Sequence, residues 1–358
     1  MNGVLHGGYV RVAACSVDGR TLVVYGSPSG EASEPTSVAL RVSAAGSVEW
    51  AVTLRARAAL RASWVGLAPG GDLVVLRLRG PSRYVALRLP SGEPAWELPV
   101  AANTGADHQD IAAVVSPDGA WIAVDLAAGG ERQIRIHSMK DGRQVAAAPV
   151  PGRWRDDLVP DRTSVWAVDS SRLFTSEPGR VVAVERDGAC STVQDLSTLD
   201  LPLCPKVSPR YIMSPTGDVC AVDTLWQAEE EGDTQDMVAL LAGPVEGNAG
   251  ADGAALVGGP WAGSGAQWAA DGNSLFFRRP RLGEGPGGDI RVRDLWVCRR
   301  PEWSLRLVRQ SVASYRAFDG GVVVVQRDAT DKCWELNWLN TRPDVAALGE
   351  VLTRLTPH

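Results

Sequence analysis

The polar side chains that could perform chemistry lie in a few short stretches. Asp107, His108 and Asp110 form the densest cluster, and their carboxylate and imidazole groups could bind a hard or borderline metal ion or transfer a proton. Three polar residues in one loop are a weak signal, so we predict no metal site. The chain has no His-Glu-x-x-His, Gly-x-Ser-x-Gly or Gly-x-x-x-x-Gly-Lys motif and no Cys-x-x-Cys pair. We therefore expect a protein that is not an enzyme and needs no cofactor, with an enzyme as the open alternative.

Arginines and tryptophans form a second group, in segments that connect one set of strands to the next. Its members are Arg153, Trp154, Arg155, Asp157, Lys206, Arg210 and Trp261. An aromatic ring beside arginines could clamp an anionic or peptide ligand. The same groups could instead fix loop geometry through salt bridges and turn hydrogen bonds. We predict that they line the mouth of a central channel, together with the cluster Asp107–Asp110.

Charges of opposite sign follow each other later in the chain. The segment 229–236 is acidic, and the repeat after it carries Arg278, Arg279, Arg281, Arg291, Arg293, Arg299 and Arg300. The two sets could attract a partner with complementary patches, satisfy each other, or stand solvated, because exposed ion pairs are typically worth below about 1 kcal/mol. Our candidates for a partner-facing surface are Glu229, Glu230, Glu231, Arg279 and Arg281.

Short strands joined by recurring tight turns must position these groups. Ser116-Pro117-Asp118-Gly119 is such a turn between two apolar runs. Related turns have residues 18, 70, 118, 170, 216, 271 and 319 at the same place, with spacings of 52, 48, 52, 46, 55 and 48 residues. Seven units of this length, each with four antiparallel strands, predict an all-β, seven-bladed β-propeller.

The repeat predicts one domain over residues 1–358, because no linker interrupts it as two separate β-sandwiches would require. The expected blades are approximately 9–54, 62–101, 110–150, 161–196, 208–258, 264–309 and 312–356. The first repeat begins almost at once with its innermost strand, and the last supplies its own outer strand. We therefore expect a closed ring with little or no exchange of strands between the termini.

Tryptophans recur at matching places in the repeats. Trp50, Trp96 and Trp303 fall at equivalent outer-strand positions, and Trp64 and Trp268 precede the first turn of their repeats. Side chains that repeat with the architecture are expected to serve it, so we predict that these five pack within or between blades.

Two motifs resemble known repeat families. The turn at 116–119 followed by an apolar strand resembles WD-repeat-like and TolB-like propellers, and the segments 91–97 and 46–50 resemble the Gly-x-x-x-Trp turn of quinoprotein-like propellers. The Gly-His and Trp-Asp dipeptides of eukaryotic WD repeats and the adjacent cysteines of quinone-cofactor dehydrogenases are missing. The resemblance implies a stand-alone bacterial propeller of the kind that accompanies ATPases, proteases or effectors in multi-protein systems, and the superfamily hosts unrelated activities.

Composition narrows the classes of partner and compartment. The net charge of −6 argues against a nucleic-acid or membrane-surface role, which needs a clear basic face. No run approaches 18 apolar residues, and the first residues lack the pattern of a signal peptide, so we expect neither a membrane span nor export. The six cysteines lie mostly in expected strands, which favours reduced thiols in the cytoplasm.

Antiparallel order predicts which face binds. The first-to-second and third-to-fourth turns lie on one face and are tight, with 243–252 as the one lengthened exception. The second-to-third loops and inter-blade connections lie on the other face and include 27–37, 225–236 and 279–289. Variable loops on a rigid scaffold commonly carry binding. We predict a protein-interaction or substrate-recruiting scaffold that binds a protein partner through the long-loop face. A propeller hydrolase or lyase at the channel mouth and a small-molecule sensor are the alternatives.

Overall fold

The structure is a computed structural model in which every regular element that is described is a β-strand, as the sequence predicts. It describes residues 9–16, 21–26, 36–42, 48–55, 63–69, 72–78, 83–89, 91–99, 113–128, 131–153, 164–177, 179–196, 209–227, 234–242, 255–279, 293–327, 334–340 and 351–355. Over these ranges, no helix is long or apolar enough to cross a membrane.

Five sheets are separate four-stranded blades with antiparallel neighbours. The first and second blades contain β1 (Tyr9–Cys15), β2 (Thr21–Gly26), β3 (Thr36–Val42), β4 (Val48–Arg55), and β5 (Ser63–Leu67), β6 (Leu73–Leu78), β7 (Arg83–Arg88), β8 (Pro94–Pro99). The third and fourth contain β9 (Ala113–Val115), β10 (Trp121–Ala128), β11 (Glu131–Ser138), β12 (Gln144–Arg153), and β13 (Val165–Trp166), β14 (Arg172–Glu177), β15 (Arg180–Glu185), β16 (Cys190–Asp195). The fifth contains β17 (Arg210–Met213), β18 (Val219–Gln227), β19 (Thr234–Ala242) and β20 (Ala255–Ala262).

The last seven strands form one continuous sheet, the terminal sheet. Its strands are β21 (Ser264–Trp268), β22 (Ser274–Arg279), β23 (Arg293–Arg299), β24 (Ser304–Phe318), β25 (Gly321–Arg327), β26 (Trp334–Asn340) and β27 (Val351–Leu355). The first part of β24 pairs with β23 and its last part pairs with β25, and Val312 has a partner in both. The prediction of seven separate blades is therefore wrong. There are five, because one 15-residue strand joins the sixth repeat to the seventh without a connecting loop.

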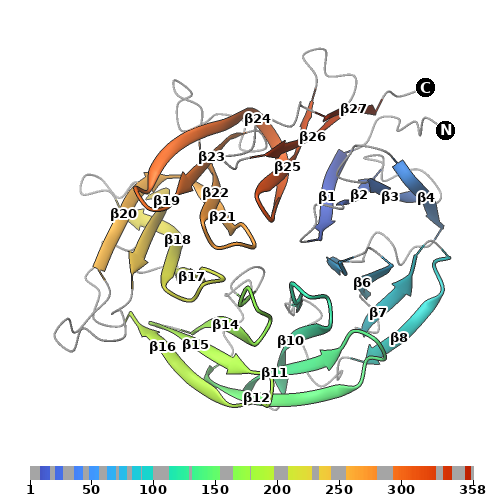
Figure 1. Cartoon of the computed structure of the whole chain (residues 1–358), viewed down its shortest axis with the longest axis horizontal. Coiled ribbons are helices and arrows are strands. Elements are labelled where there is room, and N and C mark those ends of the chain that lie inside the picture. Colours follow the sequence, from blue (N-terminus) through green and yellow to red (C-terminus); the bar gives the residue numbers. More distant parts are fainter. Residues whose placement is uncertain are drawn as a thin grey trace.

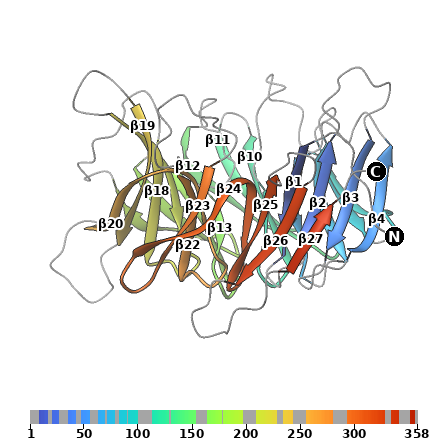
Figure 2. The ribbon, with the colours of Figure 1, turned by 90° about the horizontal axis from the view of Figure 1, so that it is seen from above.

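The sheets lie around a common axis, with the first strand of each sheet on the inside (Figure 1). Inner strands of neighbouring sheets contact one another, as β1 does with β5 and β5 with β9, and β1 also contacts β24 and β25. The strands run between the two broad faces of the disc (Figure 2). As far as the chain is described, each sheet consists of strands that are consecutive in sequence.

The hydrophobic core lies between adjacent sheets, and tryptophans connect them. Trp166 Nε1 donates to the Val114 carbonyl of the third blade at 3.0 Å, and Trp268 Nε1 donates to the Ile212 carbonyl of the fifth blade at 2.9 Å. Each tryptophan comes directly before the first turn of its repeat, so one interaction recurs at two seams. The predicted packing role is confirmed for Trp268, which is 8% exposed.

The outer tryptophans give the same result where they are described. Trp96 is buried and its Nε1 donates to the Met139 carbonyl of the third blade at 2.7 Å. Trp303 packs edge-on against Trp268, although it lies in the turn before β24 and not in a strand. The side chains of Trp50 and Trp64 lie outside the described residues.

The first-to-second turns at 116–119, 167–170, 214–217 and 269–272 share one hydrogen-bond geometry and pack against the preceding blade. In the third blade the Gly119 N–H donates to the Ser116 carbonyl at 2.9 Å, and Gly119 has a φ of 68°. A Cβ at Gly119 would lie 2.3 Å from Pro69 Cδ of the preceding blade, so the position requires glycine for its conformation and for its neighbour. The fourth blade uses Ser170 at this place with a φ of 58°, and the Ser170 hydroxyl accepts a hydrogen bond from the Asp118 N–H at 3.1 Å. This inter-blade bond stabilises the irregular fourth turn.

Candidate functional site

Three predicted site residues are described with their side chains, and all three lie at the seam between the fifth blade and the terminal sheet. Arg210 begins β17, Trp261 is near the end of β20, and Arg279 ends β22. These strand ends adjoin second-to-third loops or inter-blade connections, so the three residues belong to the long-loop face.

The remaining predicted residues cannot be placed by their side chains. Arg153 ends β12, where only the backbone is described. Outside the described residues lie Asp107, His108, Asp110, Trp154, Arg155, Asp157, Lys206, Glu229, Glu230, Glu231 and Arg281. The predicted convergence at a channel mouth therefore stays a prediction, and so does the hydrolase or lyase alternative built on the first of these residues.

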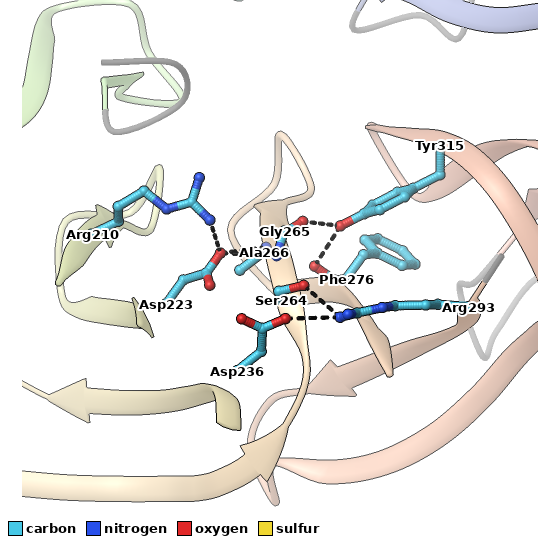
Figure 3. Close-up of polar contacts among 9 residues, drawn as sticks. All are labelled: Arg210, Asp223, Asp236, Ser264, Gly265, Ala266, Phe276, Arg293 and Tyr315. Carbon is cyan, nitrogen blue, oxygen red and sulfur yellow. Dashed lines mark hydrogen bonds and ion pairs between the residues drawn. The ribbon is translucent and has the colours of Figure 1, made fainter. Parts of the chain in front are cut away.

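A buried carboxylate organises the polar half of the seam (Figure 3). Asp223 of β18 is 4% exposed, and its Oδ2 accepts three hydrogen bonds. Arg210 Nη2 donates at 2.6 Å from the same blade, and the backbone N–H groups of Gly265 and Ala266 donate at 2.9 and 3.1 Å from the terminal sheet. Burial raises the pKa of the Asp223 carboxyl, while Arg210 and the two backbone donors oppose that rise. The Arg210 side chain is thereby fixed and remains 31% exposed.

A second ion pair crosses the same seam. Arg293 Nη1 of β23 lies 3.0 Å from Asp236 Oδ2 of β19, and it also donates to Ser264 Oγ at 2.9 Å. The Gly263 N–H donates to the Asp236 carbonyl at 2.8 Å. Of the alternatives for the acidic and basic segments, mutual satisfaction is therefore confirmed for this pair. The connection between β20 and β21 is therefore bound to Asp236 through Gly263 and to Arg293 through Ser264.

Tyr315 attaches the last part of β24 to the same region (Figure 3). Its hydroxyl lies within hydrogen-bond distance of two carbonyl oxygens, those of Gly265 and Phe276, and the second contact is 3.1 Å long. Tyr315 is 3% exposed. Three successive repeats thus meet at one junction that hydrogen bonds and an ion pair hold together.

The outer half of the seam is aromatic. Trp261 stacks on Phe277 with ring centroids 5.8 Å apart and an interplanar angle of 21°. Phe277 is opposite Trp296 in the β22–β23 register, and Trp296 is opposite Leu307 in the β23–β24 register. Arg279 Cζ lies 4.9 Å from the centre of the Trp296 ring. Trp261, Arg279, Trp296 and Leu307 form what we call the seam patch.

The seam patch is suited to binding and not to acid–base chemistry. Arg279 is its titratable side chain, and burial lowers the pKa of this guanidinium without bringing it near neutrality. In the described ranges no group of three or more histidine, cysteine, aspartate or glutamate side chains could hold a metal ion. Tryptophan and arginine are enriched among the side chains that contribute most to binding between proteins.

Sequence reasoning missed several residues of the seam. Asp223 carried a usable signal, because the third and fifth repeats share Ala-Val-Asp at 123–125 and 221–223, and both aspartates are buried in the second strand. The sequence gives no signal beyond strand alternation for Trp296, Leu307 and Tyr315, because the residues that they contact belong to other strands and repeats.

Comparisons with known proteins identify the fold and no family. No family model matches the chain, and no curated protein does. Among solved structures, the β-propeller domain of the Trilobed protease from Pyrococcus furiosus is similar, with a TM-score of 0.56 and 11% identity over 99% of this chain and 97% of that chain. The WD40 domain of Toxoplasma gondii coronin gives 0.50 and 11% over 99% and 86%. Pyrococcus horikoshii acylaminoacyl peptidase gives 0.58 and 10% over 94% of this chain but 52% of the peptidase. The chain therefore has a β-propeller fold.

Proposed function

We propose that this chain is a non-enzymatic β-propeller that binds a protein partner through its long-loop face. The observation that carries the proposal is the seam patch, in which an arginine and two tryptophans are held on strands and remain partly exposed. The tight-turn face is different, because the turn glycines Gly119, Gly142, Gly188, Gly217 and Gly272 pack closely against the preceding blade, although Gly92 has no such contact with a described residue.

Rigidity at the seam favours affinity. A side chain that is already ordered loses little conformational freedom when a partner binds, which saves about 0.5–1.5 kcal/mol for each flexible side chain. Arg279 is ordered by its stack on Trp296, and Arg210 by the buried Asp223 carboxylate. Propellers similar to this chain include both a WD40 domain and domains of peptidases, so fold alone does not choose between scaffold and enzyme.

The proposal also covers the domain organisation, the compartment, the biological setting and the closure of the ring. We place the chain as one domain in the cytoplasm, as a component of a bacterial multi-protein system that recruits a partner or a substrate. The ring closes through packing of β1 on β24 and β25, which are in contact. The predicted channel-mouth residues and the segment 229–231 extend the binding face beyond the seam.

A matched pair of exposed apolar residues tests whether the seam patch or a tight turn binds. Leu307 is 38% exposed in the seam patch, and Val168 is 48% exposed in the fourth tight turn. Immobilised wild-type protein, Leu307→Asp and Val168→Asp are each incubated with an extract of the native host, and retained proteins are quantified by mass spectrometry. We expect a set of host proteins that wild type and Val168→Asp retain and that Leu307→Asp does not. The three immobilised proteins should have equal thermal stability. Loss with Val168→Asp alone would place binding on the tight-turn face and contradict the proposal.

A further inference from the structure

Arg279 is held in place by described neighbours, but its two Nη groups have no partner among them. Its Nε donates to the Ala262 carbonyl at 3.0 Å, and its guanidinium stacks on Trp296. Its two Nη groups form no hydrogen bond or ion pair with any residue that the structure describes. The neighbouring arginines differ, because Arg293 pairs with Asp236 and Arg300 pairs with Asp218 through both Nη groups.

The carboxylate opposite Arg279 in the sheet forms no ion pair with it. Asp294 is opposite Arg279 in the β22–β23 register, but its Oδ1 accepts the Ser311 N–H at 3.0 Å. No ion pair joins the two within the described part of the chain. The positive charge of Arg279 therefore lacks a counter-charge on the described surface, although burial already makes a cation unfavourable there.

We propose that Arg279 binds a carboxylate of an acidic peptide segment in a protein partner, and that an apolar side chain next to this carboxylate packs on Trp296 and Leu307. This inference rests on the proposed function and names the chemistry of its partner. The two Nη groups of a guanidinium match the two oxygens of a carboxylate, and those of Arg279 have no partner among the described residues, while its Nε is already engaged.

The apolar part of the site selects a peptide over a small anion. Leu307 and Trp296 are directly opposite each other in neighbouring strands, and Leu307 is among the exposed large hydrophobic side chains of the described residues. A phosphate or a free carboxylate could bind the fork but would leave this apolar surface in water. A nucleic acid would bring many phosphates to a protein with a net charge of −6.

Selection from a random dodecapeptide phage library on the immobilised full-length chain supplies the probes. Enriched peptides are synthesised with a fluorophore, and their affinity is measured by fluorescence anisotropy for wild type, Arg279→Gln, Arg279→Lys, Leu307→Asp and Arg143→Gln. Arg143 is an exposed arginine of a tight turn and serves as the matched control. Thermal unfolding of each variant confirms that it is folded.

We expect peptides with an Asp, a Glu or the terminal carboxylate beside an apolar residue. Arg279→Gln should weaken binding about 10-fold or more, since a charge-assisted hydrogen-bond pair contributes that factor or a larger one. Arg279→Lys should recover only part of it, because lysine lacks the planar fork. Replacing the peptide's acid by its amide should cause the same loss in wild type and no further loss in Arg279→Gln, while Arg143→Gln changes nothing.

The outcomes separate this inference from the proposed function. Peptides that lose affinity with Leu307→Asp but not with Arg279→Gln would overturn carboxylate recognition and leave the interaction surface standing. Peptides that are insensitive to both variants, or a selection without enrichment, would overturn both. Displacement of a bound peptide by millimolar inorganic phosphate or acetate would show a bare anion site and overturn the peptide as its occupant.

Discussion

Asp223→Ala is the change with the largest expected effect on the junction. It removes the acceptor of the Gly265 and Ala266 N–H groups, and each buried donor left unsatisfied costs about 1–3 kcal/mol. The contribution of Arg210 is counted at below about 1 kcal/mol, because its side chain is a third exposed. Removing a buried carboxylate whose pKa is raised offsets part of the loss. We expect a net loss of about 3 kcal/mol.

Asp223→Asn separates the acceptor from the charge. All three donors converge on Oδ2, so one amide oxygen can replace that atom, and the expected loss is about 1 kcal/mol. Asp236→Ala is the control, since it breaks an ion pair whose aspartate is 36% exposed and should cost below about 1 kcal/mol.

Urea unfolding followed by tryptophan fluorescence measures the three variants under identical conditions, with the thermal midpoint as a second observable. A free energy of unfolding for Asp223→Ala within about 0.5 kcal/mol of that for Asp236→Ala would refute the reasoning, because surface substitutions without a special mechanism fall within that margin. So would equal losses for Asp223→Ala and Asp223→Asn.

The pH dependence of the Asp223→Asn effect provides an independent check with a defined sign. The folded-state pKa of Asp223 lies above its ordinary value of 3.8, so the folded state holds this proton more tightly than the unfolded state. The stability contributed by the protonated form is present below pH 3.8 and is lost as the pH rises through the folded pKa. The penalty of Asp223→Asn relative to wild type should therefore shrink from pH 4 toward pH 7, and a penalty that grows would contradict the burial argument.

Three other predictions concern the remaining seams. Ser170→Ala removes the acceptor of the Asp118 N–H and keeps a left-handed backbone, so urea unfolding should show a loss of about 1–2 kcal/mol, whereas Ser170→Gly should be closer to neutral. Arg132→Ala leaves the Asp125 carboxylate buried and unpaired, which should cost about 3–5 kcal/mol, and the double variant Arg132→Met, Asp125→Leu should recover most of this loss. Burial lowers the pKa of His137 below 6.5, so the thermal midpoint should fall as the pH decreases below that value, and His137→Gln should remove this part of the slope.

The second strands of two blades explain how far the repeat predicts local structure. Asp125 and Asp223 occupy the same place in β10 and β18, and both are buried. The residue two positions after each aspartate pairs across the sheet with a residue of the third strand. That third-strand residue is Arg132 in the third blade and Asp236 in the fifth. One backbone position thus carries opposite charges, and each contributes to a different inter-blade contact. A repeat therefore predicts strands and turns but not which charges they bring together.

The sequence by itself determined the features that depend on short stretches of chain. Tight turns, strand order within a blade and the tryptophans before the first turns follow from local residue types and their spacing. The number of separate blades did not follow from the sequence. Each repeat has its tight turn whether or not a loop separates it from the next repeat, and β24 runs through the boundary between the sixth and seventh repeats.

Only the tertiary structure decided which arginines are available. Arg279 and Arg293 belong to the same basic repeat, and the sequence offers no reason to treat them differently. Arg293 meets Asp236 from the fifth blade, 57 residues away, whereas Arg279 lies over Trp296 and forms no ion pair with a described residue. Ion pairs form between groups within a few ångströms in space, and the packing of one sheet against the next sets those distances.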